Sequence, residues 1–555
     1  MTIYAEPNVA LGPVQMLDGL VIHEPEGADQ PWVVELPEGR YLRLGAHAAQ
    51  LLKAADGSAG PDAISRRLGR PWTVDLVQTN LDRLAAAGLL QPSAPRSEAP
   101  SVQPAAAKAS RVRVALPASV QLTLVDPSGW IERHHGFVTR MASRLAVGVA
   151  ITVGIFGLFA LAAMPSTVHT ALSTPLPMLA VLAVFAGFLF INSLHELGHA
   201  SLLARYGGRV RRMGFMILYL SPAFFCDVSD GWRLPDRRQR VRVALAGVVV
   251  NFGLAGVVCL TSLALQGDLR AATLVLGVLC YVGTLFNLLP FVKFDGYLAL
   301  MSGLDVPYLR GKALADWRST LARVLFGGRD YRRELPEMPW APVYGLACAI
   351  APMLLVGLVS WNIATSLATW GFVGALIRLA LAAALVGLLA RSAWQVVGLA
   401  RRAHASWRRV VAGSLVAAAA VSALLMLPVS DHVGGGYWMR PDGRVVLTIG
   451  APADARRIGP GQHVVLQRQG LALRTPVGEA TVGGTDRPGS VPLESVVGFV
   501  RSGVRTSAHT FALDGVQWTG RPAAAGTASV RLGTVTLGGW LGRQLFTSPL
   551  RTLVD

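Results

Sequence analysis

Long apolar stretches alternate with short polar segments over the middle of the chain. Each stretch is about as long as the roughly 20 residues that a helix needs to cross a bilayer. No Asp, Glu, Lys or Arg occurs between Leu145 and Leu194, which a soluble core rarely sustains. The pattern predicts a polytopic α-helical membrane domain over 145–428. It has about seven spans, at 145–164, 177–203, 243–266, 272–290, 341–364, 371–396 and 410–428.

A different pattern precedes the first span. Two strand-like runs are followed by three helical patterns, at 32–36, 39–45, 45–55, 62–69 and 74–88. This order predicts a winged-helix-like domain over 1–91. Residues 92–144 are expected to form a linker and an interfacial segment, because the stretch 92–112 is rich in Pro, Ala and Ser.

The last part of the chain, 429–555, is rich in Gly and in β-forming residues. Short runs such as RVVLTIG and QHVVLQRQ are separated by turn residues, which predicts an all-β domain. Within the membrane domain, the segment 211–235 is apolar yet strand-like. We expect a membrane-embedded hairpin or edge strand there, against which an extended peptide could pair.

Composition and charge support this division. The chain is 52% hydrophobic and only 15% charged, and its formal net charge is +18. Nine Lys or Arg lie in 205–242, seven in 303–340 and four in 401–409, whereas the intervening loops carry at most one. By the positive-inside rule, the basic segments face the cytoplasm. We therefore expect a multi-pass cell-membrane protein with a cytoplasmic N-terminus, an extracytoplasmic C-terminal domain and no nucleic-acid partner.

One polar motif, HELGH, lies inside the second apolar stretch. On a helix, His195 and His199 are one turn apart on the same face, so both imidazoles can hold one metal ion. Glu196 can take a proton from a water at that metal and deliver it to a leaving amine. A charged residue at membrane depth costs roughly 2.5–3.5 kcal/mol, which a bound dication offsets. The alternative is a histidine pair that binds no metal.

Two histidines and a water leave tetrahedral zinc one protein ligand short. The segment NLLPFVKFDG, 287–296, ends the fourth apolar stretch and is interrupted by Pro290. Irregular backbone at membrane depth is tolerated where it lines a cavity or is buried in protein. Asp295 is therefore the predicted third ligand of one Zn²⁺ ion.

The two motifs together, HELGHA at 195–200 and NLLPFVKFDG at 287–296, resemble those of the site-2 protease class of intramembrane zinc metalloproteases. Within that class they resemble the branch of peptide zinc metalloproteases. The resemblance implies the same three zinc ligands and the same general base. It adds Asn287 as a candidate for substrate binding near the site.

This chain departs from the class in two segments. Val292 and Phe294 stand where the class usually has a proline and a leucine, which fits the peptide-metalloprotease branch. Val248 stands where the class has the proline of a G-P-x-x-N segment. Asn251 of this segment is a candidate for holding the substrate backbone, with helix–helix hydrogen bonding as the alternative.

The soluble parts carry two further resemblances. The run LGAHAAQLLKAADG with VDLVQTNLDRLAAAGLL resembles the RiPP recognition element, which holds leader peptides of ribosomally synthesised natural products (RiPPs). A generic winged helix is the alternative. The phrases RIGPGQHVVLQRQG and GTASVRLGTVTLGGWL resemble the barrel-sandwich and β-barrel of periplasmic adaptor proteins of hemolysin-type secretion. A structural or substrate-shielding β domain is the alternative.

Together the resemblances imply an intramembrane zinc endopeptidase that removes the leader of a RiPP precursor, and the daptide type is the most similar group. The implied partners are a precursor peptide or transmembrane substrate, the lipid bilayer and export machinery. Regulated intramembrane proteolysis of a membrane-bound regulator is one alternative. A non-catalytic peptide export or immunity protein is another.

Overall fold

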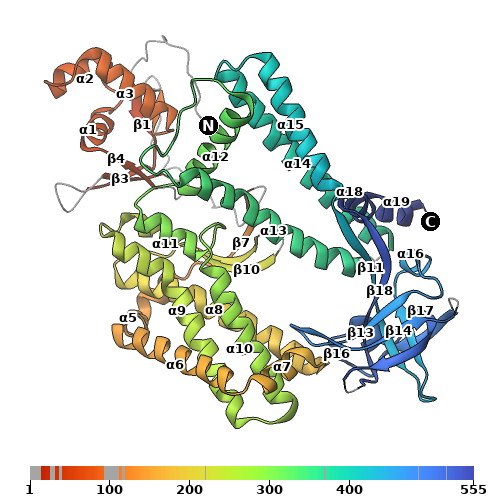
Figure 1. Cartoon of the computed structure of the whole chain (residues 1–555). Coiled ribbons are helices and arrows are strands. Elements are labelled where there is room, and N and C mark those ends of the chain that lie inside the picture. The colour runs from red at the N-terminus through yellow and green to blue at the C-terminus, as the bar shows by residue number, and fades with distance from the viewer. Residues whose placement is uncertain are drawn as a thin grey trace.

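The protein is described by a computed structural model. The described residues are 14–24, 32–36, 41–92, 112–115, 119–218, 221–367, 371–484, 487–520 and 522–554. Figure 1 shows an N-terminal module at the upper left, long helices through the centre and a β domain at the lower right.

Seven helices of the described chain are long and apolar enough to cross a membrane, as predicted. They are α6 (Arg144–Ala163), α8 (Met178–Arg205), α9 (Arg237–Thr261), α10 (Gly267–Asn287), α13 (Ala341–Leu367), α14 (Gly371–Arg402) and α15 (Trp407–Leu425). Large apolar side chains stand exposed on their outer faces, such as Leu145 at 78% and Phe159 at 66% on α6. Lipid, rather than water, is the solvent that such a surface requires. The protein is therefore a polytopic helical membrane protein.

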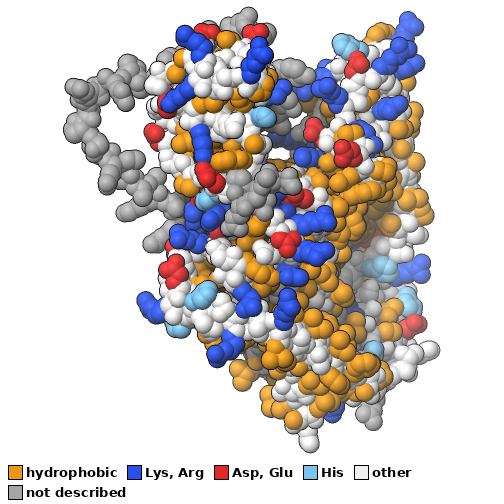
Figure 2. Space-filling view, turned by 90° about the vertical axis from the view of Figure 1, so that its left-hand side faces the viewer, with side chains coloured by type: hydrophobic (Ala, Val, Ile, Leu, Met, Phe, Trp, Pro, Cys, Tyr) orange, Lys and Arg blue, Asp and Glu red, His pale blue; other side chains and the backbone are white. Residues whose placement is uncertain are grey.

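The first turns of α9 extend the predicted span toward its N-terminal side. The helix begins at Arg237 rather than near 243, and the Asp236 side chain accepts a hydrogen bond from the Arg238 backbone N–H at 2.8 Å. This N-cap allows a basic turn to precede the apolar part of the helix. Figure 2 shows Lys and Arg side chains gathered over the middle of one face of the molecule, while the lower end of that face is mostly hydrophobic.

Shorter helices join or flank the spans. They are α4 (Ser128–Arg133), α5 (His135–Met141), α7 (Pro165–Ser173), the 3₁₀ helices η1 (Ser229–Arg233) and η2 (Ser262–Ala264), α11 (Asp295–Gly303) and α12 (Leu309–Phe326). The helix α12 packs against α13, α14 and α15, and α11 packs against α9. Thus α11 and α12 connect the first four spans to the last three.

The N-terminal module has the two strands and three helices that the sequence predicts, and three further strands that were not predicted. In chain order, these elements are β1 (Val14–Met16), β2 (Val21–His23), β3 (Trp32–Glu35), β4 (Tyr41–Leu44), α1 (Ala46–Ala54), α2 (Pro61–Leu68), α3 (Val74–Ala86) and β5 (Leu90–Pro92). The predicted ones are β3, β4, α1, α2 and α3. The sheet β2-β3-β4 is antiparallel, and β1 pairs separately with β5. The hydrophobic core of the module includes Val34, Leu51, Leu81 and Leu89. The winged-helix likeness stays a prediction.

A four-stranded sheet links the segment before the first span to the predicted hairpin. Strands β9 (Met213–Leu218) and β10 (Ser221–Cys226) form that hairpin, and β9 also pairs with β7 (Ser119–Val125), which pairs with β6 (Val112–Ala115). The described residues 112–115 and 119–144, within the predicted linker and interfacial segment, thus form strands and helices. Residues 93–111, the rest of the predicted linker, lie outside the described residues.

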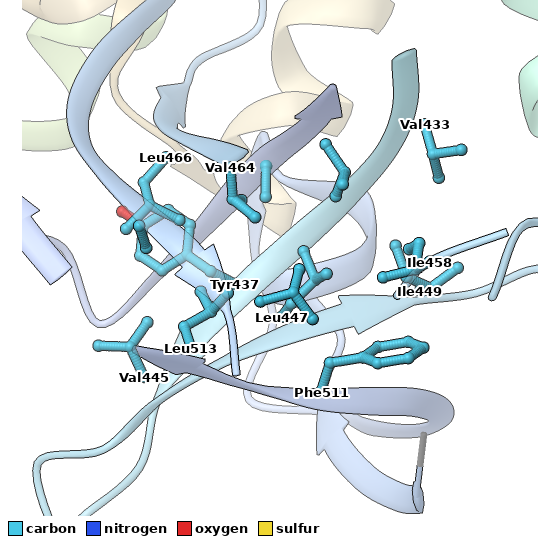
Figure 3. Close-up of a cluster of buried hydrophobic side chains, with 14 of the residues drawn as sticks. Val433, Tyr437, Val445, Leu447, Ile449, Ile458, Val464, Leu466, Phe511 and Leu513 are labelled. Carbon is cyan, nitrogen blue, oxygen red and sulfur yellow. The ribbon is translucent and has the colours of Figure 1, made fainter. Parts of the chain in front are cut away.

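The C-terminal domain is a β-barrel. Its strands are β11 (Pro428–Met439), β12 (Val445–Ile449), β13 (His463–Gln469), β14 (Arg474–Val482), β15 (Arg487–Pro492), β16 (Val500–Arg501), β17 (Arg505–Trp518) and β18 (Ala525–Thr536). The order β12-β11-β18-β13-β14-β17 closes on itself through the pairing of β12 with β17. Figure 3 shows the barrel interior, where Tyr437, Leu447, Leu466 and Phe511 pack together. Closure leaves these six strands without a free edge.

The barrel also contains short helices, and the chain ends in helix rather than strand. These helices are α16 (Pro452–Ala455), α17 (Glu494–Val497), α18 (Leu537–Gly542), the π-helical turn η4 (Arg543–Thr547) and α19 (Ser548–Val554). The all-β prediction did not include the terminal helices. They lie on α14, where the buried Arg378 donates to the carbonyl oxygen of Gln544 at 2.8 Å. This contact gives a basic residue within an apolar span a hydrogen-bond partner.

Candidate metal centre

The helix α8 carries the HELGH motif without interruption. His195 and His199 lie on one face, and each has only 4% of its surface exposed. Their Nε2 atoms are 3.2 Å apart. The spacing of four residues therefore brings both imidazoles to one point, as the helical period predicts.

Asp295 is the first residue of α11 and faces the same point. Its Oδ2 lies 2.9 Å from Nε2 of His195, and its Oδ1 lies 3.3 Å from Nε2 of His199. The next residue, Gly296, makes this approach possible, because a Cβ there would lie 2.1 Å from the carbonyl oxygen of Leu288. The structure thus brings together the three predicted ligands, whose candidate atoms all lie within 4.8 Å of one another.

The hydrogen bonding of His199 shows that this arrangement suits a cation. Its Nδ1 lies 2.7 Å from the carbonyl oxygen of Val243, which only accepts, so Nδ1 carries the proton. In a neutral ring, Nε2 then presents a lone pair to the Asp295 carboxylate. Lone pairs that converge at such distances repel unless a positive charge lies between them. Two imidazole nitrogens and a carboxylate oxygen are a donor set that zinc commonly takes.

Glu196 projects beside the two histidines and meets the end of the hairpin. The backbone N–H of Cys226, the last residue of β10, donates to the Glu196 carboxylate. The strand β10 packs along α8 and is an edge strand of its sheet. One carboxylate therefore lies between the three ligand side chains and a strand whose outer edge can pair with a peptide.

Two residues of α9 complete the surroundings, and the sequence analysis did not single them out. Val243 orients the His199 ring through its carbonyl. At Gly247, a Cβ would lie 2.4 Å from Nε2 of His199 and 2.6 Å from Nε2 of His195. A glycine is required here because α9 passes directly over the imidazoles. The signal was present in the sequence, since this glycine begins the GVVVN segment that contains Asn251.

The two asparagine candidates lie on α9 and at the end of α10. Asn251 is 2% exposed, and its Nδ2 donates to Oγ1 of Thr284 at 3.3 Å and to the carbonyl oxygen of Cys280 at 3.4 Å, both on α10. These contacts fit the helix–helix alternative. Asn287 ends α10 half-buried. No side-chain hydrogen bond joins it to another described residue.

One comparison supports a membrane-embedded metalloprotease. The family model described as Peptidase family M50 matches residues 183–280, which contain the HELGH motif and most of α9 and α10 but end before Asp295. The match supports a metalloprotease of the site-2 type that acts within the membrane. No curated protein and no solved structure matches the chain.

Proposed function

We propose that this protein is an intramembrane zinc endopeptidase in which His195, His199 and Asp295 hold one Zn²⁺ ion. The observation that carries the proposal is the convergence of their ligand atoms, buried in a membrane domain, beside a glutamate. The match of 183–280 to a metallopeptidase family supports it independently. The non-catalytic export or immunity alternative has no comparable support.

The chain's own residues supply the acid–base chemistry. A zinc ion held there would polarise a peptide carbonyl and lower the pKa of a water towards about 7. Glu196 would take the proton of that water and pass it to the leaving nitrogen. The Cys226 N–H holds the Glu196 carboxylate in place. Glu196 would thus act first as a general base and then as a general acid.

Peptide bonds within a transmembrane helix are shielded by their own hydrogen bonds, so a substrate must become extended before water can attack it. The open edge of β10 offers backbone groups for such an extended segment. Because β10 ends at Cys226 beside Glu196, a peptide added along this strand would run past the proposed metal. We propose that the extended substrate pairs with β10 as an added strand.

The substrate that we propose is a ribosomal precursor peptide whose leader is removed, as in daptide-type RiPP maturation. The N-terminal module contacts the protease at the ends of the helices that carry the site, which suits a module that receives a leader. We further propose that this side faces the cytoplasm, since the basic segments 205–242 and 303–340 lie there. Cleavage would then occur near the inner leaflet.

The first test is chemical and uses the full-length protein in lipid nanodiscs. We expect one zinc per chain, and we expect Glu196→Gln to keep that zinc while lowering cleavage roughly 10²–10⁴-fold, the usual contribution of a general acid–base. Asp295→Asn should instead lose zinc. Elemental analysis and a cleavage assay give both readouts. Wild-type protein without stoichiometric zinc, together with unchanged behaviour of Glu196→Gln, would reject the enzyme.

The second test concerns the substrate. Short precursor peptides encoded near this protein's own coding sequence are co-expressed with the wild type or with Glu196→Gln, and their masses are compared. Leader removal by the wild type alone supports the RiPP role. If a membrane-bound regulator is cut and every precursor is spared, regulated intramembrane proteolysis replaces it.

A further inference from the structure

The sheet β2-β3-β4 of the N-terminal module has a second buried face. Alternate residues of a strand point to opposite faces. Val34 points into the module's core, so Val33 and Glu35 point away from it, and Arg43 shares their face because it pairs directly with Val33. Yet Val33 is only 7% exposed and Glu35 only 6%. Something outside the module's core must cover them.

The cover is the membrane protease, and charged contacts fix it there. Glu35 Oε1 lies 2.5 Å from Nη1 of Arg211. Asp305 Oδ1 accepts from Nη1 of Arg43 and from Nη2 of Arg240, each at 2.6 Å. The indole ring of Trp232, on η1, lies near both guanidinium groups, with its centroid 5.2 Å from Cζ of Arg43 and 5.8 Å from Cζ of Arg240.

The charged protease residues of this interface lie within, or a few residues beyond, helices that build the metal centre. Arg211 follows the end of α8, the helix of both histidines, by six residues. Arg240 lies in the first turn of α9, three residues before the Val243 carbonyl that orients His199. Asp305 follows the end of α11 by two residues, and α11 begins with Asp295. One face of one small sheet therefore contacts Arg211 after α8 and Asp305 after α11, and Asp305 in turn contacts Arg240 of α9.

Asp305 forms ion pairs both within the protease and with the module. It connects α11 to α9 through Arg240, a side chain only 4% exposed that also donates to the carbonyl oxygen of Leu234 at 2.7 Å. It connects both helices to the module through Arg43. A carboxylate shared by two guanidinium groups and flanked by an aromatic ring forms charge-assisted hydrogen bonds with fixed geometry. Because α11 is only nine residues long, a shift at Asp305 moves Asp295 with it.

We propose that Asp305 is a positioning residue through which the docked N-terminal module sets the geometry of the metal centre. The module, on this view, is part of the catalytic unit as well as a receiver of peptide. Since such coupling is reciprocal, metal binding in turn steadies the docked module. The proposal rests on the proposed zinc site, and its test is chosen so that the two can fail separately.

The conformation of Asp305 offers a clean substitution. Its φ of 56° lies in the left-handed region, where Asn is tolerated nearly as well as Asp. Asp305→Asn thus removes the charge and keeps the backbone. Arg43→Gln breaks only the contact to the module and leaves the pair of Asp305 with Arg240. The control is Arg67→Gln, which removes an exposed ion pair inside the same module. In that pair, Nη1 of Arg67 lies 2.8 Å from Oδ2 of Asp56.

The first readout is the rate at which full-length protein in nanodiscs releases zinc to a chelator. We expect Asp305→Asn to speed release roughly 2–30-fold, the range in which a coupled network acts on a distant site. Arg43→Gln should have a smaller effect in the same direction, and Arg67→Gln none. Wild-type release rates for both Asp305→Asn and Arg43→Gln would overturn the proposal.

The second readout is hydrogen exchange, which needs no metal. Amides of α11 should exchange faster in Asp305→Asn and in Arg43→Gln, while amides of α3 keep wild-type protection, which shows that the module stays folded. If the wild type holds no zinc, the zinc-site proposal fails while this readout still decides the positioning role. Unchanged exchange in α11 would then reject it.

Discussion

The N-terminal module and the β domain meet the membrane domain near opposite ends of α8, by different chemistry. The N-terminal module docks through charged side chains, of which Glu35, Arg43 and Arg240 are largely buried and Arg211 and Asp305 are about half exposed, at 52% and 45%. The β domain docks through backbone: Val500 pairs with Leu176 in parallel register, and the Leu473 N–H donates to the carbonyl oxygen of Leu172 at 2.9 Å. One exposed ion pair, Arg501 with Asp268 at 2.7 Å, accompanies these contacts.

This difference indicates at which positions a substitution should disturb the metal centre. His195 comes 17 residues after Met178, the start of α8, and that is about 26 Å of helix at 1.5 Å per residue. The β domain contacts α8 near that start through β16, which also pairs with the residues just before α8. The module, in contrast, contacts residues within a few positions of the helices' other ends. Substitutions should therefore affect the metal less the nearer they lie to the β domain.

The largest effect is expected at Gly247, where α9 crosses the imidazoles. In Gly247→Ala the new methyl group would lie 2.4 Å from Nε2 of His199, so a ring must move. We expect zinc affinity to fall by about 100-fold or more, at or beyond the upper end of what removing an outer-shell partner costs. The zinc content after dialysis against a buffered chelator measures it.

The matched control for that substitution lies on the same helix. In Gly256→Ala the methyl group would lie 2.3 Å from the carbonyl oxygen of Val153, so helix packing is disturbed to a similar degree away from the metal. This variant should unfold at a lower temperature and keep its zinc. Equal zinc loss in both variants would mean that general destabilisation, rather than the position of the rings, causes it.

Much of this site was predictable, because local spacing carries it. The positions of His195 and His199 follow from helical periodicity, and a third ligand follows from the coordination number of zinc. That Asp295 lies beside both histidines was predicted, and the structure has it so. The seven apolar spans were predictable for the same reason, since each is continuous in sequence and needs no knowledge of its neighbours.

The rest depends on contacts between distant parts of the chain, which leave no periodic signal. The strand β7 pairs with β9, which lies about 90 residues further on, so the prediction of a linker and an interfacial segment over 92–144 did not include this sheet. In the sequence alone, Arg43 and Glu35 resemble ordinary surface charges. Their contacts with the protease could therefore not be predicted. The terminal segment LGGWLGRQLF is rich in glycine and follows a strand, yet it is helical in the structure, where α18 packs on α15 and η4 packs on α14.

A smaller effect is expected one turn beyond Gly247, at Asn251. If its hydrogen bonds to α10 are its role, Asn251→Ala should cost about 0.6 kcal/mol of stability and at most about 1.7, as measured for such bonds between membrane helices. Thr284→Val removes the partner, and the double variant should cost less than the sum of the two. Thermal unfolding in nanodiscs gives these values. A raised KM for peptide without loss of stability would instead favour substrate binding by Asn251.

The smallest effect is expected at the far end, where Arg501 meets Asp268. Both side chains are about half exposed, at 49% and 55%, and such ion pairs contribute about 0.2–1 kcal/mol. Arg501→Gln should therefore lower the stability of the docked β domain slightly, and more at low salt than at high salt, because salt already screens the pair. Zinc release should keep the wild-type rate, since Asp268 is in the first turn of α10 and Arg501 pairs with Pro177 just before α8, a helix length away from His195. Arg501→Gln could instead release zinc as fast as Asp305→Asn does. Both docked domains would then affect the metal equally, and the contrast between them would not hold.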